Sequence, residues 1–333
     1  MNSYTGCAAL HSWLAAARPR SPKTNFSHRK GKCKLIYLKV LLSLFQSLPA
    51  VQSFLRTKEI GSEYGIGFRA KLELLLRFIR NTKEVETLSD FREHVELAAA
   101  VLRVPRSTIG SVVECGCYVG GSTVNLSLVC AMVGRKLIVC DSFEGLPEPQ
   151  EYDRWHHSVH VGHTDIYYKG RFAATRRTVE ENVSKFGNIS VCEFRPGYYE
   201  DTMPGFSEQA VLAFLDVDLI DSLKPCLEGL WPLLSPGCRV YTHEARNLAL
   251  VAVFFDQAWW QETLHEDAPG FVGSGAGLPL GLGLGLGSEL GYAQKPLAAT
   301  GAAPDQDPEI IREALYDWER ETYAQMREQQ GQK

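Results

Sequence analysis

Acidic side chains end two β-rich runs in the second half of the chain. Asp216 and Asp218 end the run AVLAFLDVD, with Asp221 close behind, while His243 ends the run CRVYTH and Glu244 follows it. Alternate residues of a strand share a face, so we expect Asp216 and Asp218 to point the same way. Oxygen-rich clusters suit a hard divalent cation such as Mg²⁺, without which the carboxylates would repel one another. The alternative is that Asp218 and Asp221 cap the next helix.

A glycine-rich turn, VVECGCYVGGST, follows an earlier β-rich run. Glu114, Gly116, Gly120 and Gly121 are spaced E-x-G-x-x-x-G-G, which differs from the dinucleotide fingerprint G-x-G-x-x-G. Glycines let a backbone approach a ligand closely, and the N–H groups at a helix start attract negative charge. Asp141 ends the next run about 20 residues on, where an acidic side chain would hold ribose hydroxyls. Together these features indicate a nucleoside cofactor, whereas a structural turn and a helix cap are the alternatives.

A histidine-rich segment, DRWHHSVHVGHTD, lies where an active-site loop would be. Its spacing matches no standard zinc frame, so we expect a substrate-facing loop, with surface histidines or a dedicated metal site as the alternatives. The nine cysteines include no paired CxxC frame, which indicates a reduced, cytoplasmic protein. We interpret the CxC pair, Cys115 and Cys117, as packing. The four histidines are His156, His157, His160 and His163.

These residues must be positioned by an alternation of strands and helices that begins at Ser111. The predicted strands are SVVECG, KLIVCD, ISVCEF, AVLAFLDVD and CRVYTH. The predicted helices between and after them are STVNLSLVCAMV, RRTVEENVSKF, SLKPCLEGLWPLL and ARNLALVAVFFDQAWW. Such alternation predicts parallel crossovers and a doubly wound α/β sheet. Ligands of these sheets bind at the carboxyl ends of the strands, where the chain order reverses.

Four parts follow along the chain. Residues 1–33 are a basic arm that we expect to be poorly ordered, since no Asp or Glu precedes Glu59; a solvated tail is favoured over a phosphate or membrane-surface contact. Residues 34–110 form a helical N-terminal layer that includes the periodic segments AKLELLLRFIRN and FREHVELAAAVLRV. Residues 111–300 hold the α/β domain, whose Gly-Leu tract we interpret as a flexible connection or edge hairpin, with a lid as the alternative. Residues 301–333 contain a C-terminal helix.

Composition narrows the function classes. The net charge of −4 and a pI near 6.2 argue against a general nucleic-acid binder, which needs a concentrated basic face. The apolar stretch LIYLKVLLSLF is broken by Lys39 and is shorter than the roughly 20 residues of a transmembrane helix. The long apolar helices before Ser111 and the C-terminal helix offer surfaces for a homo-oligomer.

Several motifs resemble those of the macrocin O-methyltransferase (TylF) family of class I S-adenosylmethionine-dependent methyltransferases. They are VVECGCYVGGST, VCDSFEGLPEP, FRPGYYEDTMP and FLDVDLIDSLKPCLEGLWPLLSPG, and the similarity covers about residues 75–262. The resemblance implies a Rossmann-like, mostly parallel seven-stranded sheet with helices on both faces, in the methyltransferase domain 111–300. It also implies S-adenosylmethionine as methyl donor, Mg²⁺ as a requirement, and a hydroxyl acceptor such as a sugar or glycoside on a natural product.

The same resemblance assigns roles to individual residues. Asp216 matches the first metal carboxylate of the family, and Asp218 matches its general base, a role for which His243 is the second candidate. Where the family usually has two adjacent aspartates that complete the metal site, this chain has His243 and Glu244. Glu can ligate Mg²⁺, whereas neutral His ligates softer metals. The cofactor would contact Glu114, Gly116, Cys117, Tyr118, Gly120, Gly121 and Ser122 at its methionine part, and Asp141, Ser142 and Phe143 at its ribose and adenine.

Three rival functions remain open on the sequence. The first is a non-catalytic protein of the same fold that binds S-adenosylmethionine or acts as a scaffold, its metal site altered at His243 and Glu244. The second is a nicotinamide-dependent oxidoreductase, which the glycine spacing disfavours. The third, an enzyme that modifies sugar nucleotides, lacks any recognisable pyrophosphate loop.

Overall fold

The computed structural model describes residues 50–151, 153, 167–245, 247–272 and 288–297. The basic arm, the four histidines of the histidine-rich segment, the centre of the Gly-Leu tract and the predicted C-terminal helix therefore lie outside the described residues. The described residues from 50 to 295 belong to one compact unit. No helix in the described ranges is long and apolar enough to cross a membrane.

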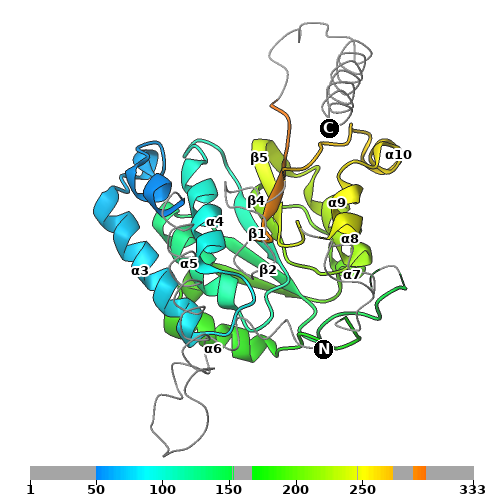
Figure 1. The fold of residues 1–333 in the computed structure, drawn as a ribbon, viewed down its shortest axis with the longest axis horizontal. Helices are drawn as coiled ribbons and strands as arrows, with labels where there is room; N and C mark the ends of the chain where they lie inside the picture. The colour runs from blue at the N-terminus through cyan, green and yellow to red at the C-terminus, as the bar shows by residue number, and fades with distance from the viewer. Residues whose placement is uncertain (1–49, 152, 154–166, 246, 273–287, 298–333) are drawn as a thin grey trace, which may run out of the picture. The chain divides into compact units, whose positions relative to one another are not determined.

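A single sheet with the strand order β3-β2-β1-β4-β5-β6 forms the centre of this unit (Figure 1). Its first five strands are parallel, and β6 runs antiparallel to β5. The predicted α/β class and mostly parallel sheet are confirmed, but the described sheet has six strands rather than seven. The chain order reverses at β1, which lies between β2 and β4. The strands are β1 Ser111–Cys115, β2 Leu137–Asp141, β3 Cys192–Pro196, β4 Ala210–Leu215, β5 Leu234–Thr242 and β6 Gly291–Gln294.

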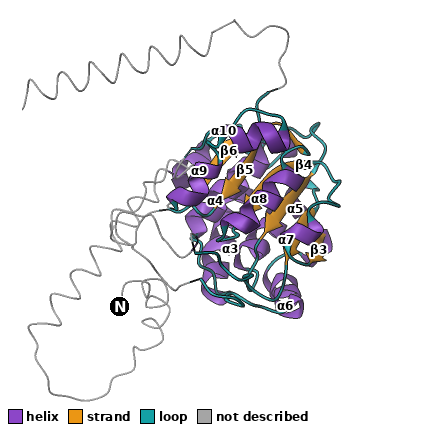
Figure 2. Cartoon of the chain, turned by 90° about the vertical axis from the view of Figure 1, so that its right-hand side faces the viewer, coloured by secondary structure: helices purple, strands orange, loops and turns teal. Residues whose placement is uncertain are grey.

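Helices cover both faces of the sheet. The helices α3, α4, α5 and α6 contact one another on one side, and α7, α8 and α9 form a second group on the other (Figure 1). Figure 2 looks onto the second group, with the strands behind it. The helices are α3 Phe68–Glu84, α4 Phe91–Arg103, α5 Gly121–Val133, α6 Arg176–Phe186, α7 Tyr199–Thr202, α8 Ile220–Leu230, α9 Leu248–Val253 and α10 Gln257–Trp259, and the short turns are η1 Ser62–Tyr64, η3 Ile189–Val191 and η4 Trp260–Leu264.

Local sequence explains where α4 and α5 begin. Asp90 caps α4 by accepting a hydrogen bond from the Arg92 N–H, and Glu93 reaches back to the Asp90 N–H, which together make a capping box. The α5 helix lies between two glycines in the left-handed conformation, Gly120 and Gly134, and its first ten residues are buried. The helices α3 and α4 pack against α5, and Thr87 of the N-terminal layer lies next to Gly121 in the turn after β1.

Five predicted boundaries are wrong. The predicted helix SLKPCLEGLWPLL ends at Leu230, and the strand predicted from Cys238 begins at Leu234. Strand β4 ends at Leu215, three residues early, and Asp218 could not have continued it because its backbone is left-handed (φ 62°). The predicted strand ISVCEF begins with the η3 turn, whose start is capped by the Asn188 side chain. The predicted helix from residue 245 to 260 is divided into α9 and α10 because Asp256 caps a new helix start at the Trp259 N–H.

Candidate active site

Tight turns follow three parallel strands at the edge where the chain order reverses. Tyr118, Phe143 and Asp218 have left-handed backbone angles (φ 47°, 57° and 62°) just after β1, β2 and β4. Such angles are outliers for aromatic residues and cost roughly 1–3 kcal/mol each. Strained backbone of this kind gathers at functional sites, so the carboxyl edge of the sheet is the candidate active site.

The glycines of the first turn are required by packing. A Cβ atom on Gly116 would lie 1.9 Å from the Asp216 carbonyl oxygen, where the ends of β1 and β4 meet. A Cβ atom on Gly121 would lie 2.5 Å from the Thr87 Cβ of the N-terminal layer. The sequence left open that these glycines are needed only to form the turn. Close packing does require glycine at both positions, whatever ligand the turn binds.

Glu114 is a buried carboxylate whose closest polar neighbours, the Ser122 and Thr123 hydroxyls, do not meet hydrogen-bond geometry. Its side chain is 0% exposed, and neither oxygen has a partner among the described residues. Burial raises the pKa of Glu114 to about 7; the nearby Ser122 and Thr123 hydroxyls offset part of this effect, and Asp216 and Asp141 add to it. A buried carboxylate is costly unless paired, so this site is built to receive a cationic or hydrogen-bond-donating group.

Asp141 joins the turns after β1 and β2. Its Oδ2 accepts a hydrogen bond from the Cys117 N–H (2.8 Å), and its Oδ1 accepts one from the Phe143 N–H (2.7 Å). The Ser142 hydroxyl donates to the Gly145 carbonyl oxygen and so shapes the same turn. Each carboxylate oxygen keeps a second lone pair, which leaves Asp141 able to accept from a ligand hydroxyl as well.

A cluster of candidate metal ligands lies at the ends of β4 and β5. Asp216, His243 and Glu244 each offer one ligand atom, and these atoms all lie within 4.8 Å of one another. Burial and the nearby Asp216 together raise the pKa of Asp218 to about 7, although a hydrogen bond from Tyr167 offsets part of their effect. Burial likewise holds the pKa of Glu244 well above its usual range. The structure thus brings together the three predicted metal residues beside the predicted base.

Asp216 and Asp218 do not share a face of β4, and they do not cap the next helix. The strand ends before both residues, and the N-cap of α8 is Leu219, without a side-chain cap. Instead Asp153, from a distant loop, accepts a hydrogen bond from the Ile220 N–H at the start of α8 (3.1 Å). Neither Asp216 nor Asp218 is therefore used as a helix cap.

His243 has a partner that the sequence analysis missed. Its Nε2 lies 3.1 Å from Glu93 Oε2, and its Nδ1 lies 3.6 Å from Asp216 Oδ1. Burial alone would lower the pKa of His243, but Glu93 and Asp216 outweigh it and hold the pKa well above its usual value. In the sequence, Glu93 stands out only as part of the capping motif that begins at Asp90. That motif predicts the start of a helix and gives no indication of a contact with His243, 150 residues away.

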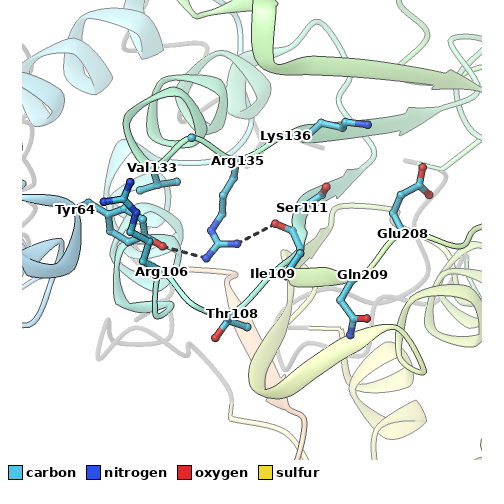
Figure 3. Close-up of a pocket in the computed structure, with 12 residues that line it drawn as sticks. Tyr64, Arg106, Thr108, Ile109, Ser111, Val133, Arg135, Lys136, Glu208 and Gln209 are labelled. Atoms are coloured by element: carbon cyan, nitrogen blue, oxygen red, sulfur yellow. Dashed lines mark hydrogen bonds between the residues drawn. The ribbon is translucent and has the colours of Figure 1, made fainter.

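A cavity of about 530 Å³ lies elsewhere, at the amino ends of β1, β2 and β4. Arg135 points into it and donates hydrogen bonds to the Gly110 carbonyl oxygen and the Tyr64 hydroxyl (Figure 3). It also donates one to the Pro105 carbonyl oxygen. These bonds tie the N-terminal layer to the end of α5. Ligands of doubly wound sheets bind at the opposite edge, so this cavity is not the candidate site.

Comparisons with known proteins agree with the resemblance found in the sequence. The family model described as macrocin O-methyltransferase (TylF) matches residues 88–266, more than half of the chain. A curated relative from Streptomyces olivaceus, 8-demethyl-8-(2,3-dimethoxy-alpha-L-rhamnosyl)-tetracenomycin-C 4′-O-methyltransferase, is 34% identical over 133 residues, which are 38% of this chain and 50% of the relative. The chain thus spans about half the length of this relative.

The chain is also similar to the solved structures of two methyltransferases. The O-methyltransferase NovP is 16% identical, with a TM-score of 0.48, and the match covers 76% of this chain and 99% of NovP. The calicheamicin methyltransferase CalS11 is 17% identical, with a TM-score of 0.39, and the match covers 84% of this chain and 98% of CalS11.

Proposed function

The chain belongs to the macrocin O-methyltransferase (TylF) family, and from this membership we propose that it transfers a methyl group from S-adenosylmethionine to a hydroxyl of a sugar or natural-product acceptor. The name of the relative from Streptomyces olivaceus describes a methyltransferase acting on a rhamnosyl-bearing tetracenomycin, which supports this class of acceptor. A small-molecule acceptor also agrees with the acidic charge of the chain, which does not suit nucleic acid.

The single observation that carries the proposal is the unpartnered carboxylate of Glu114. S-Adenosylmethionine has a positively charged amino group and a positively charged sulfonium. Glu114 lies at the glycine turn after β1, and Asp141 and Asp216 are close enough to affect its pKa. A cationic cofactor would pair with the buried carboxylate and lower the repulsion along this edge. The residues present therefore fit S-adenosylmethionine.

We propose that Asp216, His243 and Glu244 hold a divalent cation. Two carboxylates and one imidazole form the donor set. Mg²⁺ prefers oxygen ligands, while imidazole suits metals such as Zn²⁺, Fe²⁺ and Ni²⁺. The residues fit a divalent cation, and we expect Mg²⁺ to bind more weakly here than a metal that accepts a nitrogen ligand.

In the proposed mechanism, Asp218 accepts the proton of the acceptor hydroxyl as its oxygen takes the methyl group from the sulfonium, which leaves a neutral thioether. A pKa near 7 suits a general base at neutral pH, and the hydrogen bond from Tyr167 holds Asp218 in place. When bound, a cation polarises the acceptor hydroxyl. His243 is less suited to take the proton because its Nε2 faces Glu93 and its Nδ1 faces Asp216 in the proposed cation site.

Methyl transfer from radiolabelled S-adenosylmethionine to a panel of glycosides and phenols tests the proposal. We expect Asp218→Asn to lower kcat by roughly 10²–10⁴-fold, the range for removing a general base. Asp216→Ala should weaken cation binding and activity together. The control is Asp221→Asn, in the first turn of α8, which should keep full activity.

Full activity in both Asp216→Ala and Asp218→Asn would overturn the proposed acidic centre. Calorimetry with S-adenosylmethionine, with and without added cation, distinguishes the rival function. A protein that binds the cofactor without transferring its methyl group, and without any effect of cations, would be the scaffold rather than the enzyme.

A further inference from the structure

Both carboxylate oxygens of Glu93 face two hydrogen-bond donors each inside the candidate site. Its Oε1 accepts hydrogen bonds from the Ser288 hydroxyl (2.7 Å) and from the Glu289 N–H (2.8 Å). Its Oε2 accepts one from the Asp90 N–H (2.8 Å) and faces His243 Nε2 at 3.1 Å. The Glu93 side chain is only 4% exposed. Four donors from three parts of the chain therefore converge on one carboxylate.

The orientation of the His243 ring follows from this contact. A carboxylate that faces Nε2 requires a proton on that nitrogen, because two acceptors cannot share a hydrogen bond without one. The other ring nitrogen, Nδ1, is then the one directed at Asp216, at 3.6 Å. Histidines that ligate metals usually donate the second N–H to a carboxylate in this way, which fixes both tautomer and ring orientation.

Glu93 also brings a further segment to the site. Ser288 and Glu289 precede β6, and the Glu289 carbonyl oxygen accepts a hydrogen bond from the Ala245 N–H, next to Glu244. The Glu289 carboxylate lies near enough to Asp216 and Glu244 to raise the pKa of both. The side chain that caps α4 thus joins the N-terminal layer, the end of β5 and the start of β6.

We propose that Glu93 is a positioning residue of the cation site: it holds His243 so that Nδ1, and not Nε2, binds the metal beside Asp216. The proposal rests on the cation site proposed above. It makes the N-terminal layer part of the active centre, since Glu93 belongs to α4. Nothing in the resemblance to the family assigns a role to Glu93.

The first test is nitrogen NMR of the full-length protein labelled with ¹⁵N-histidine and titrated with Zn²⁺. We expect His243, assigned as the signal lost in His243→Asn, to show a protonated Nε2 and a Zn²⁺-bound Nδ1. A proton on Nδ1 with the metal on Nε2 would overturn the proposal. This measurement needs no change in α4.

The second test is a double-mutant cycle on Zn²⁺ affinity with Glu93→Gln and His243→Asn. The amide oxygen of the introduced asparagine can take the place of Nδ1, but the shorter side chain does not reach Glu93. Removing the negative charge of Glu93 weakens cation binding whether residue 243 is histidine or asparagine. The loss of the hydrogen bond that orients the His243 ring weakens cation binding only in the protein that has His243. We expect Glu93→Gln to weaken Zn²⁺ binding about 10–100-fold in the protein that keeps His243. In the His243→Asn protein, the loss of Zn²⁺ affinity caused by Glu93→Gln should be smaller by a factor of at least about five.

The matched control is Glu96→Gln, one turn along the same helix, where Glu96 accepts a hydrogen bond from the Tyr241 hydroxyl. It should leave the His243 signals unchanged. Equal losses in the two backgrounds would assign Glu93 a merely structural role. A wild-type protein that binds no Zn²⁺ would overturn both this proposal and the cation part of the proposed function, whereas cofactor binding, measured without metal, would still test the methyltransferase itself.

Discussion

Glu114 shows how a single residue can favour function at the expense of stability. Folding buries its carboxylate without a partner and raises its pKa from 4.5 to about 7. Between these two values the folded protein keeps a proton that the unfolded chain releases, so stability falls as pH rises. Well above pH 7 the full cost applies, roughly 3 kcal/mol. A cationic ligand that pairs with the ionised carboxylate would recover this free energy.

We therefore predict opposite effects of Glu114→Gln on stability and on binding. The neutral amide should raise the free energy of unfolding of the ligand-free protein at pH 8 by roughly 1–3 kcal/mol, because no charge is buried. It should weaken S-adenosylmethionine binding about 10–100-fold, since a charge-assisted hydrogen bond is lost. Urea unfolding and calorimetry measure the two effects.

The pH dependence gives a second check on the same residue. Wild-type affinity for S-adenosylmethionine should fall as pH is lowered through about 7, whereas the affinity of Glu114→Gln should be flat over this range. Glu96→Gln, which replaces a half-buried carboxyl that also has a raised pKa, should leave cofactor affinity unchanged. A variant that binds the cofactor as tightly as wild type would exclude Glu114 from the cofactor site.

At the scale of elements, the ends of the strands carry the site because they approach one another so closely. The turn after β1 touches the backbone after β4 at Gly116, where there is no room for a side chain. Asp141 then ties the β1 turn to the β2 turn. The positions of Glu114 and Asp216 thus depend on contacts between turns rather than on the strands alone.

We predict that Gly116→Ala destabilises the protein far more than Gly134→Ala. Both glycines have left-handed backbone angles, φ 85° and 68°, so both variants incur the roughly 1–2 kcal/mol cost of an L-residue there. Only Gly116 meets backbone at 1.9 Å, whereas a Cβ on Gly134 meets nothing within 4 Å. We expect an additional loss of at least about 3 kcal/mol at Gly116, measured by urea unfolding. Equal losses would contradict the close contact between β1 and β4.

At the scale of the whole molecule, a buried polar chain docks the N-terminal layer on the sheet domain. The Asn81 side-chain amide donates to Asn125 Oδ1 (2.9 Å), and Asn125 Nδ2 donates to His94 Nδ1 (2.7 Å). His94 Nε2 pairs in turn with the Ser89 hydroxyl (2.8 Å). Burial lowers the pKa of His94 to about 4, so the ring is neutral at pH 7. These hydrogen bonds fix the positions of α3, α4 and α5 relative to one another. They thereby place Glu93, which belongs to α4, at the candidate site.

We predict that Asn125→Leu lowers the free energy of unfolding by roughly 2–4 kcal/mol, because it leaves Asn81 and His94 buried without their partner. Chemical unfolding followed by circular dichroism measures the loss. Asn182→Ala is the control, since this half-buried residue makes one hydrogen bond, to the Val119 carbonyl oxygen, and should cost about 1 kcal/mol or less. Similar values for the two variants would show that the polar chain does not secure the layer.

The sequence by itself determined the α/β alternation, the acidic residues at the strand ends and the family. Each of these depends on a local pattern, because alternation and helical periodicity report which face of an element is buried. It did not determine where β4 ends, or that the backbone of Asp216 leaves no room for a side chain at Gly116. The second of these depends on a contact between two turns about a hundred residues apart in the chain.

Only the tertiary structure decided that Glu93 meets His243. The capping motif predicts the start of α4, but the carboxylate reaches a strand end 150 residues away only because α4 docks against α5 and β4. That docking depends on the complementary shapes of buried side chains and on the Asn81, Asn125 and His94 chain. The periodicity of a sequence specifies which face of a helix or strand is buried, but not which other element that face packs against. The candidate site is completed by this packing between elements.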